Sequence, residues 1–471
     1  MIKPSFIKTL ESAIVCNWSS VAFTDYDTAT SLKYQDVAQE IERIHLILRQ
    51  CGIRKEDKVA LMGRNSSSWA ITYLGIMTYG AIVVPILQDF KPNDTIHILN
   101  HSESQLFFVS DSLYESLDIE QMEQVKAVLS IFTYNVLATK SNRFKKSDIE
   151  PEEIARLSLQ HYPGGITPEK IHYCDKDNSE IASINYTSGT TGFSKGVVTR
   201  LNALAGNVKF CSEHHVVYKQ SRQLIFLPLA HAFGCAFDFL TTFCVGGHAY
   251  FFGKTPSPRI LLQAFREVKP TCIFTVPLIL EKIYKKQILP LISKTPINWA
   301  LQMPILDEVL LKKLRQKMMD AFGGEFDEVI IGGAPLNAEV EAFLNRIHFP
   351  YTVGYGLTEC APLISYSKAK DFREGSCGKT LEHLMEVRVT DPDEKGIGEL
   401  QVRGEHVMVC YYKNQEATAE VFTEDGWLKT GDLGYVDEDG FIFIKGRNKT
   451  MLLGPNGQNI YPEEIEAKLN N

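Results

Sequence analysis

Apolar positions in the first part of the chain alternate between two spacings. Short apolar runs lie at residues 58–62, 81–86 and 105–109, and amphipathic segments with helical spacing separate them. Strands that alternate with amphipathic helices predict a parallel sheet covered on both faces. A second series of this kind has strands expected at 224–229, 248–252 and 272–276. We therefore expect an α/β fold with two lobes of largely parallel sheets.

Residues 69–87 carry no charged side chain and approach the length of a membrane span. Gly75, Gly80 and Pro85 interrupt this stretch. We therefore interpret it as a helix that ends at Gly80, followed by a buried strand, and not as a membrane-spanning helix.

The pattern changes after residue 368, where short apolar runs are separated by acidic turns such as residues 391–396 and 437–440. This pattern predicts a small β-barrel or sandwich. Near the end of the chain, Pro462 followed by two glutamates is typical of a helix start. The expected parts are a first α/β lobe at 1–180, a second at 181–367, a β-barrel at 368–445, and a hinge with the start of a further domain at 446–471.

Composition and charge narrow the class of protein. The chain has 471 residues, of which 44% are hydrophobic and 23% charged, so a disulfide scaffold and a largely disordered chain are both excluded. Its 49 basic and 57 acidic side chains give a net charge of −8, which provides no global positive field for a nucleic acid. Its 10 cysteines form no CxxC pair, and no apolar segment follows the N-terminal lysines. We expect a cytoplasmic protein with reduced thiols and no signal peptide.

The segment YTSGTTGFSKGV at residues 186–197 is the most informative motif. Glycines allow backbone N–H groups to approach phosphate oxygens, hydroxyl groups donate hydrogen bonds, and Lys195 supplies positive charge. The alternative is a surface turn rich in small polar residues. The density of donors favours a phosphate-binding loop, although the GK[ST] ending of a Walker A loop is missing.

This segment resembles the phosphate loop of the adenylate-forming superfamily, which includes acyl-CoA synthetases, luciferases and peptide-synthetase adenylation domains. Further motifs follow in the order of that superfamily, from the first α/β series to the last residues. The resemblance is strongest to long-chain acyl-CoA synthetases at residues 277–286, 354–365 and 457–466. It implies that the phosphate loop uses the following residues: Thr187, Ser188, Gly189, Thr190, Thr191, Gly192 and Lys195.

The resemblance also implies a nucleotide site. Gly333, Ala334 and Pro335 resemble the turn beside the adenine base, and GYGLTE at residues 354–359 resembles the segment that contacts the base and the α-phosphate. The roles implied there are stacking on adenine for Tyr355, nucleotide contact for Gly356, α-phosphate contact for Thr358, and magnesium binding for Glu359 together with Thr187. A flat aromatic ring, a hydroxyl donor and a hard carboxylate suit these partners.

Two later motifs complete this comparison. KTGDLG at residues 429–434 resembles the motif whose aspartate, here Asp432, accepts hydrogen bonds from both ribose hydroxyls, since a carboxylate has two acceptor oxygens. GRNK at residues 446–449 resembles the motif with a nucleotide-contacting arginine, here Arg447, and an interdomain hinge, here Lys449.

His231 in LPLAHAFG matches a histidine that the superfamily places near the acyl carboxylate. Without that match, a hydrogen-bonded core histidine would be the favoured interpretation, and the motif reverses this preference. The apolar segment after it is a candidate wall of an acyl pocket, for which the resemblance suggests Phe233, Gly234, Phe237 and Val276.

The implied function is ATP-dependent activation of a fatty, long-chain carboxylic acid to acyl-AMP with release of pyrophosphate, then transfer to CoA. The cofactors and substrates are ATP, Mg2+, CoA and a fatty acid. In the superfamily a further domain after the hinge supplies a lysine that bridges carboxylate and α-phosphate, and we expect this chain to be impaired without it. Two alternatives remain: an acyl-AMP ligase that loads a carrier protein, and a non-catalytic module that binds an acyl group or a nucleotide.

Other features give weaker expectations. His97 and His101 have the i, i+4 spacing that can bind zinc, but no HExxH motif or third ligand accompanies them. We expect small-molecule partners and no nucleic acid. Peripheral contact with a membrane, the acyl chain length and the oligomeric state are left open by the sequence.

Overall fold

The computed structural model describes residues 1–140, 146–187, 195–254, 257–292 and 304–448, together with the short strands β22 (Leu452–Leu453) and β23 (Asn459–Ile460). Its contacts divide the chain into two compact units. Unit 1 contains Met1–Thr255 and Met408–Gln415, and unit 2 contains Pro256–Val407 and Glu416–Asn471.

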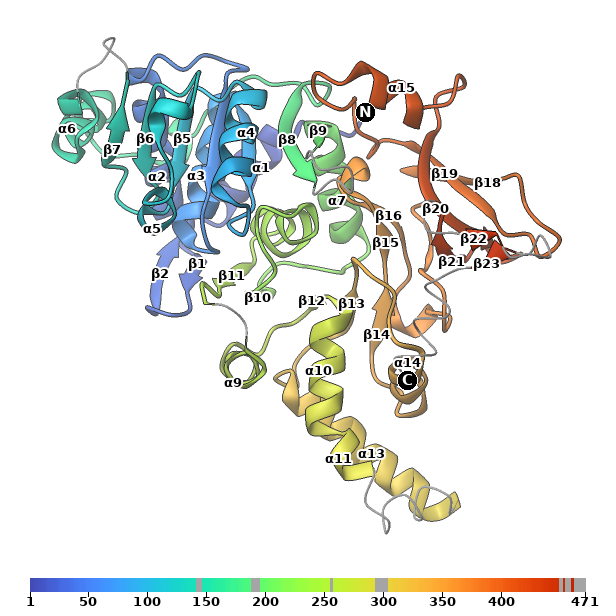
Figure 1. Ribbon diagram of the computed structural model, residues 1–471. Coiled ribbons are helices and arrows are strands. Elements are labelled where there is room, and N and C mark those ends of the chain that lie inside the picture. The colour runs from blue at the N-terminus through green and yellow to red at the C-terminus, as the bar shows by residue number, and fades with distance from the viewer. Residues whose placement is uncertain are drawn as a thin grey trace. The chain divides into compact units, whose positions relative to one another are not determined.

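Unit 1 is built around a seven-stranded sheet with the order β7-β6-β5-β3-β4-β8-β9 (Figure 1). The central strands pair in parallel, whereas the outer pairs β6–β7 and β8–β9 are antiparallel. The strand bounds are Lys58–Met62 (β3), Ile82–Ile86 (β4), Leu106–Val109 (β5), Ala127–Ser130 (β6), Val136–Thr139 (β7), Ile181–Thr187 (β8) and Lys195–Arg200 (β9). The parallel α/β sheet expected from the sequence is confirmed.

Alternate residues of the central strands point to two different cores. In β3, Val59 and Leu61 join the core cluster that contains residues of α2 (Tyr34–Gln50) and α3 (Ser67–Tyr79). Ala60 and Met62 instead join a second cluster that contains residues of α4 (Pro92–Ser102). Because both faces are covered, β3, β4 and β5 are apolar at every position except Lys58.

The charge-free stretch at residues 69–87 folds as expected. Helix α3 ends at Gly80, which adopts φ 99° as its left-handed C-cap, and the fully buried strand β4 follows. Among the described residues, no helix combines the length and the apolar character that crossing a membrane requires.

A second, four-stranded sheet of unit 1 has the order β10-β11-β1-β2. Its strands are Val21–Asp25 (β1), Thr30–Lys33 (β2), Arg222–Ile225 (β10) and His248–Phe251 (β11). The expected strand at 224–229 is therefore wrong in its second half. There, the Asn65 side chain takes the place of a neighbouring strand: its Nδ2 donates to the Leu227 carbonyl (2.8 Å) and its Oδ1 accepts from the Leu229 N–H (3.0 Å).

Strands β8 and β9 lie after residue 180, where the sequence led us to expect the second lobe. In the structure they belong to the seven-stranded sheet of unit 1, because β8 pairs with β4 and β9 pairs with β8. Unit 1 also contains the α-helices Phe6–Cys16 (α1), Asp111–Tyr114 (α5), Pro151–His161 (α6), Leu201–Glu213 (α7) and Thr242–Cys244 (α8), together with the π-helix Gly234–Thr241 (η4).

Unit 2 begins with a parallel sheet of three strands, ordered β12-β13-β14. The strands are Ile273–Thr275 (β12), Val329–Ile331 (β13) and Tyr351–Val353 (β14). The accompanying helices are Pro258–Val268 (α9), Pro277–Gln287 (α10), Leu289–Ile292 (α11), Pro304–Ala321 (α13) and Ala338–Arg346 (α14) (Figure 1).

The segment expected to form a β-barrel is instead open. Strands β18 to β21 form an antiparallel sheet in sequence order, with β18 and β21 at its edges. The outer edge of β21 is contacted by the residues directly before β17: the Ile442 N–H donates to the Gly378 carbonyl at 2.9 Å, and the Cys377 N–H donates to the Ile442 carbonyl at 2.7 Å. These bonds connect the sheet to the small antiparallel sheet β15–β17. In the described part of the chain the expected closed barrel is therefore wrong. The bounds are Tyr355–Gly356 (β15), Leu363–Tyr366 (β16), Lys379–Thr380 (β17), Met385–Thr390 (β18), Gly398–Gly404 (β19), Leu428–Val436 (β20) and Ile442–Arg447 (β21), with the helix Gln415–Val421 (α15) between β19 and β20.

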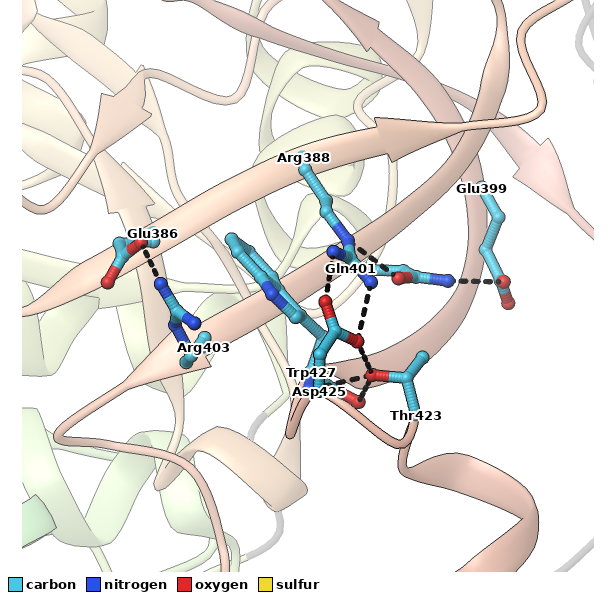
Figure 2. A network of polar contacts seen from close by, with 8 residues as sticks. All are labelled: Glu386, Arg388, Glu399, Gln401, Arg403, Thr423, Asp425 and Trp427. Atoms are coloured by element: carbon cyan, nitrogen blue, oxygen red, sulfur yellow. Dashed lines mark hydrogen bonds and ion pairs between the residues drawn. The ribbon is translucent and has the colours of Figure 1, made fainter.

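A polar network stabilises this sheet around Trp427 (Figure 2). The guanidinium carbons of Arg388 and Arg403 lie 4.5 and 4.6 Å from the centre of its ring. Arg388 pairs with Asp425 at 2.6 Å, and Arg403 pairs with Glu386 at 2.7 Å. Since each guanidinium has both an aromatic and an acidic partner, these arginines join neighbouring strands and their charges are neutralised locally.

Candidate functional site

In unit 2 the three parallel strands end at one edge of their sheet. Thr275, Ile331 and Val353 lie in register, and the segments after them contain Val276, Gly333 and Tyr355. A Cβ atom added to Gly333 would lie 3.8 Å from Val276 Cγ1, so these two segments are close together. Ligands of open α/β sheets bind outside the carboxyl ends of the strands. This edge is therefore the candidate site of unit 2, and Ala334 and Pro335 continue the turn after β13.

Tyr355 and Asp432 meet at this site although they are distant in sequence. The Tyr355 hydroxyl donates to Asp432 Oδ2 at 2.7 Å, and Arg447 Nε lies 3.0 Å from Asp432 Oδ1. Asp432 and Arg447 are paired residues of β20 and β21. The residues Tyr355 and Asp432 are 6% and 4% exposed, whereas the Arg447 side chain is largely open to solvent. Each carboxylate oxygen of Asp432 thus accepts one hydrogen bond and has a further lone pair that can accept a second one.

Burial is the main influence on Asp432 and raises the pKa of its carboxyl group. The Tyr355 hydroxyl and the Arg447 guanidinium act in the opposite direction, while the negative charge of Glu359 raises this pKa further. The net pKa is above its ordinary value. The sheet therefore holds a costly buried carboxylate, and its two donors offset part of that cost.

Thr358 and Glu359 begin the short helix η5 (Thr358–Cys360), directly after Gly356 and Leu357. Both side chains are partly exposed. In the described residues, no group of three or more His, Cys, Asp or Glu side chains could hold a metal ion. Glu359 offers the kind of single carboxylate through which Mg2+ binds when substrate phosphates supply other ligands.

In unit 1 the ends of the candidate phosphate loop are fixed by a hairpin. Thr187 and Lys195 are paired across β8 and β9. The residues between them, Ser188, Gly189, Thr190, Thr191 and Gly192 among them, lie outside the described residues. Lys195 Nζ lies 4.8 Å from the ring centre of Tyr411, which forms an antiparallel bridge with Val197.

The sequence did not identify Tyr411 as part of this site. Its neighbour Tyr412 donates its N–H to the Gly196 carbonyl at 2.7 Å and its hydroxyl to Glu103 at 3.0 Å. Lys413 also pairs with Glu103, at 2.9 Å. These contacts dock segment 408–415 on the hairpin. The adjacent aromatic pair was the only signal in the sequence, because nothing local relates residue 103 to residue 412.

His231 follows the segment that Asn65 holds. The Phe233 N–H donates to its Nδ1 at 3.3 Å, so in the neutral ring Nε2 carries the proton. The histidine reaches the surface, yet its neighbours exclude enough water from the ring for desolvation to lower its pKa. A neutral imidazole with an Nε2 donor is the form that this environment favours.

The expected acyl-pocket residues fall in both units. Phe233 and Phe237 contact each other in unit 1, with ring centres 5.6 Å apart in a T-shaped arrangement. Gly234 begins the π-helix η4 between them, and Val276 lies at the sheet edge of unit 2. The expected hinge residue Lys449 lies outside the described residues.

The two histidines with zinc-like spacing have other contacts. The rings of His97 and His101 stack with centres 5.7 Å apart, and His101 Nδ1 lies 2.8 Å from the Tyr186 hydroxyl. His101 is thereby linked to the hairpin that carries Thr187 and Lys195.

Comparison with known proteins agrees with these features. The model of the AMP-binding enzyme family matches residues 13–412, and the chain therefore belongs to this family. It is 28% identical over 475 residues to the long-chain-fatty-acid–CoA ligase FadD15 of Mycobacterium bovis, covering 93% of this chain and 73% of that protein. It is 27% identical over 507 residues to long-chain-fatty-acid–CoA ligase 1 of Saccharomyces cerevisiae, covering 97% of this chain and 70% of that protein.

The fold also matches that of solved structures. The crystal structure of ATP-bound MatB from Rhodopseudomonas palustris superposes with a TM-score of 0.75 at 22% identity, over 99% of this chain and 83% of that chain. The resemblance to the adenylate-forming superfamily, and within it to long-chain acyl-CoA synthetases, is confirmed by these relatives.

Proposed function

We propose that this protein is an AMP-forming acid–thiol ligase that activates a long-chain fatty acid with ATP and transfers the acyl group to CoA. The observation that carries the proposal is the match of residues 13–412 to the AMP-binding enzyme family, together with relatives named as long-chain-fatty-acid–CoA ligases. The hydrogen-bonded Tyr355, Asp432 and Arg447 at a sheet edge support a nucleotide site there.

In the first half-reaction a carboxylate oxygen of the acid attacks the α-phosphorus of ATP, and the bond to pyrophosphate breaks. In the second, the sulfur of CoA attacks the carbonyl carbon of acyl-AMP, the bond to AMP breaks, and the thiol proton passes to solvent. Both steps place negative charge on phosphate oxygens, so catalysis depends mainly on fixed donors and cations.

The nucleotide roles fall on the residues at the carboxyl edge of unit 2. Asp432 would accept from the ribose hydroxyls with its remaining lone pairs, and Arg447 and Thr358 would donate to nucleotide oxygens. The turn at Gly333 and the ring of Tyr355 would contact the base. Mg2+ bound through Glu359 would neutralise phosphate charge.

The phosphate and acid roles fall on residues of unit 1. Lys195 and the hydroxyls of the loop that begins at Thr187 would bind the phosphates. His231, neutral with its proton on Nε2, would donate to the acid carboxylate without introducing a second positive charge. Phe233 and Phe237 would provide apolar surface for the acyl chain.

Two measurements on this chain test the proposal. The first is calorimetric binding of a nonreactive acyl-adenylate analogue, palmitoyl-sulfamoyl adenosine, which does not depend on the rate of turnover. The second is release of pyrophosphate from ATP and Mg2+ with a series of acids from acetate to palmitate. AMP formation is then compared with free CoA and with a phosphopantetheine-bearing carrier protein as acceptor. Failure of the analogue to bind, with no stimulation of pyrophosphate release by any acid, would reject the proposal.

A matched pair of variants connects binding with the site. Asp432→Asn removes the buried charge, and we expect it to weaken analogue binding by about tenfold or more, because hydrogen bonds to charged groups contribute about 1.5–3 kcal/mol. Asp439→Asn changes an exposed aspartate in the turn between β20 and β21, so binding should stay at the wild-type value. Equal affinities for the two variants would contradict the role assigned to Asp432.

A further inference from the structure

The π-helix η4 has two faces of different character. Cys235, Phe239 and Leu240, spaced i, i+4 and i+5, belong to the main core of unit 1. The Phe239 ring lies 6.4 Å from that of Trp69 and 5.9 Å from that of Tyr73. These three positions define the face of η4 that packs on the core.

Phe233, Phe237 and Asp238 have the same i, i+4, i+5 spacing, and each lies two residues before the corresponding residue of the core-facing set. Two residues are close to half a turn of a helix with i→i+5 hydrogen bonds, so these positions lie on the opposite face. The T-shaped contact between the Phe233 and Phe237 rings agrees with this placement. Phe237 and Asp238 are buried, and Phe237 belongs to neither of the two hydrophobic core clusters described above. Asp238 thus shares a face with the residues proposed to contact the acyl chain.

Asp238 is buried without a hydrogen-bond partner. It is 1% exposed, and within the described part of the chain neither of its carboxyl oxygens has a donor or acceptor. Other buried carboxyl groups are satisfied: Glu328 accepts from the Ala369 N–H and Glu341 from the Gly375 N–H, both at 2.9 Å. Buried polar groups in folded proteins are almost always hydrogen-bonded, so an exception implies a partner that the described residues do not supply.

We propose that Asp238 is a specificity-determining residue that binds a hydroxyl group on the chain of the substrate acid, and that the preferred substrates are hydroxy fatty acids. This inference rests on the proposed function. A hydroxyl group both donates and accepts, so it pairs with a carboxyl group in either protonation state. An amino group would instead enter as a buried cation and carry a large desolvation cost. Burial also raises the pKa of Asp238, which favours the neutral acid as the hydroxyl's partner.

The unpaired carboxyl group of Asp238 would also make the site selective between substrates. A plain acyl chain leaves the Asp238 carboxyl group unpaired in an apolar pocket, whereas a hydroxyl group at the right carbon satisfies it. Sites that hydrogen-bond a substrate hydroxyl discriminate strongly against the analogue without it. We expect at least tenfold tighter binding for one position of the hydroxyl group than for the unsubstituted chain.

The experiment measures calorimetric affinities for acyl-sulfamoyl adenosines of one chain length, unsubstituted or carrying a hydroxyl group at each of several carbons. The proteins are the wild type, Asp238→Leu, Asp238→Asn and the control Phe239→Leu, which alters the opposite face. We expect the preference to disappear in Asp238→Leu through loss of affinity for the hydroxylated ligand alone. It should persist in Phe239→Leu and in part in Asp238→Asn, whose amide still forms hydrogen bonds.

The outcomes separate the two proposals. The deciding quantity is the ratio of the affinities for the hydroxylated and the unsubstituted analogue. If this ratio is the same in the wild type and Asp238→Leu, or if the wild type prefers no hydroxyl position, the assignment of Asp238 is overturned. The proposed function is not affected by either result, because the unsubstituted analogues still bind. If Asp238→Leu does not fold, the ratio in Asp238→Asn decides, and an unchanged ratio there overturns the assignment. If no analogue binds the wild type, the proposed function itself fails and this inference fails with it.

Discussion

Replacing Tyr355 with phenylalanine isolates one hydrogen bond to a buried charge. The variant loses the hydroxyl group that donates to Asp432 Oδ2 at 2.7 Å and keeps the ring. Both side chains are buried, so water cannot readily replace the donor. Hydrogen bonds to charged groups contribute about 1.5–3 kcal/mol, and we expect the free energy of unfolding to fall by that amount at pH 7.

The same variant should show a defined pH dependence. Burial raises the pKa of Asp432 in the folded state, whereas the hydrogen bond from Tyr355 lowers this pKa. Removing the hydroxyl group should therefore raise the folded-state pKa of Asp432 further. A carboxyl group whose pKa is higher in the folded state stabilises the fold at low pH, and this stabilisation is lost as pH rises through the folded pKa. At pH 4 and below, the bond increasingly becomes one between neutral groups, so the loss should shrink to about 0.5–1.5 kcal/mol.

Urea unfolding, followed by tryptophan fluorescence at pH 7 and pH 4, measures both effects. Trp427 lies directly before β20 and therefore reports on this sheet. Tyr435→Phe is the control, because Tyr435 is on the same strand, is partly exposed and packs its ring on Phe443 with centres 4.8 Å apart. The reasoning is refuted if both variants lose the same stability at pH 7, or if Tyr355→Phe loses more at pH 4.

Two other changes test local contacts. Tyr411→Leu removes the ring beside Lys195 Nζ and should weaken the binding of ATP with Mg2+ by about twofold or more in calorimetry, since cation–π contacts contribute about 0.5–1 kcal/mol at exposed sites and more when desolvated, and Tyr411 is buried. Tyr411→Phe keeps the ring and should bind normally, and equal weakening of the two would count against the contact. Gly356→Ala would place a Cβ atom 2.1 Å from the Pro362 carbonyl oxygen, so we expect a lower melting temperature, whereas Gly164→Ala, with open space around it, should melt as the wild type does.

Local patterns in the sequence determined the secondary structure and the family. The apolar spacing predicted the alternation of strands and helices, and Gly80 marked the end of α3 because a left-handed C-cap favours glycine. The motifs around Thr187, Tyr355 and Asp432 pointed to the AMP-binding enzyme family, which the match over residues 13–412 confirmed. Such signals are readable because each depends on residues that are neighbours in sequence.

Only the tertiary structure decided which distant segments pair. It placed β8 beside β4 across the expected lobe boundary, and it left the expected barrel open, with the residues directly before β17 bonded to the edge of β21 at Ile442. It also brought Tyr355 to Asp432, and it buried Asp238 on the face of η4 opposite the core. Hydrophobic spacing specifies which face of an element is buried but not its partner, because that choice depends on how all the elements pack together.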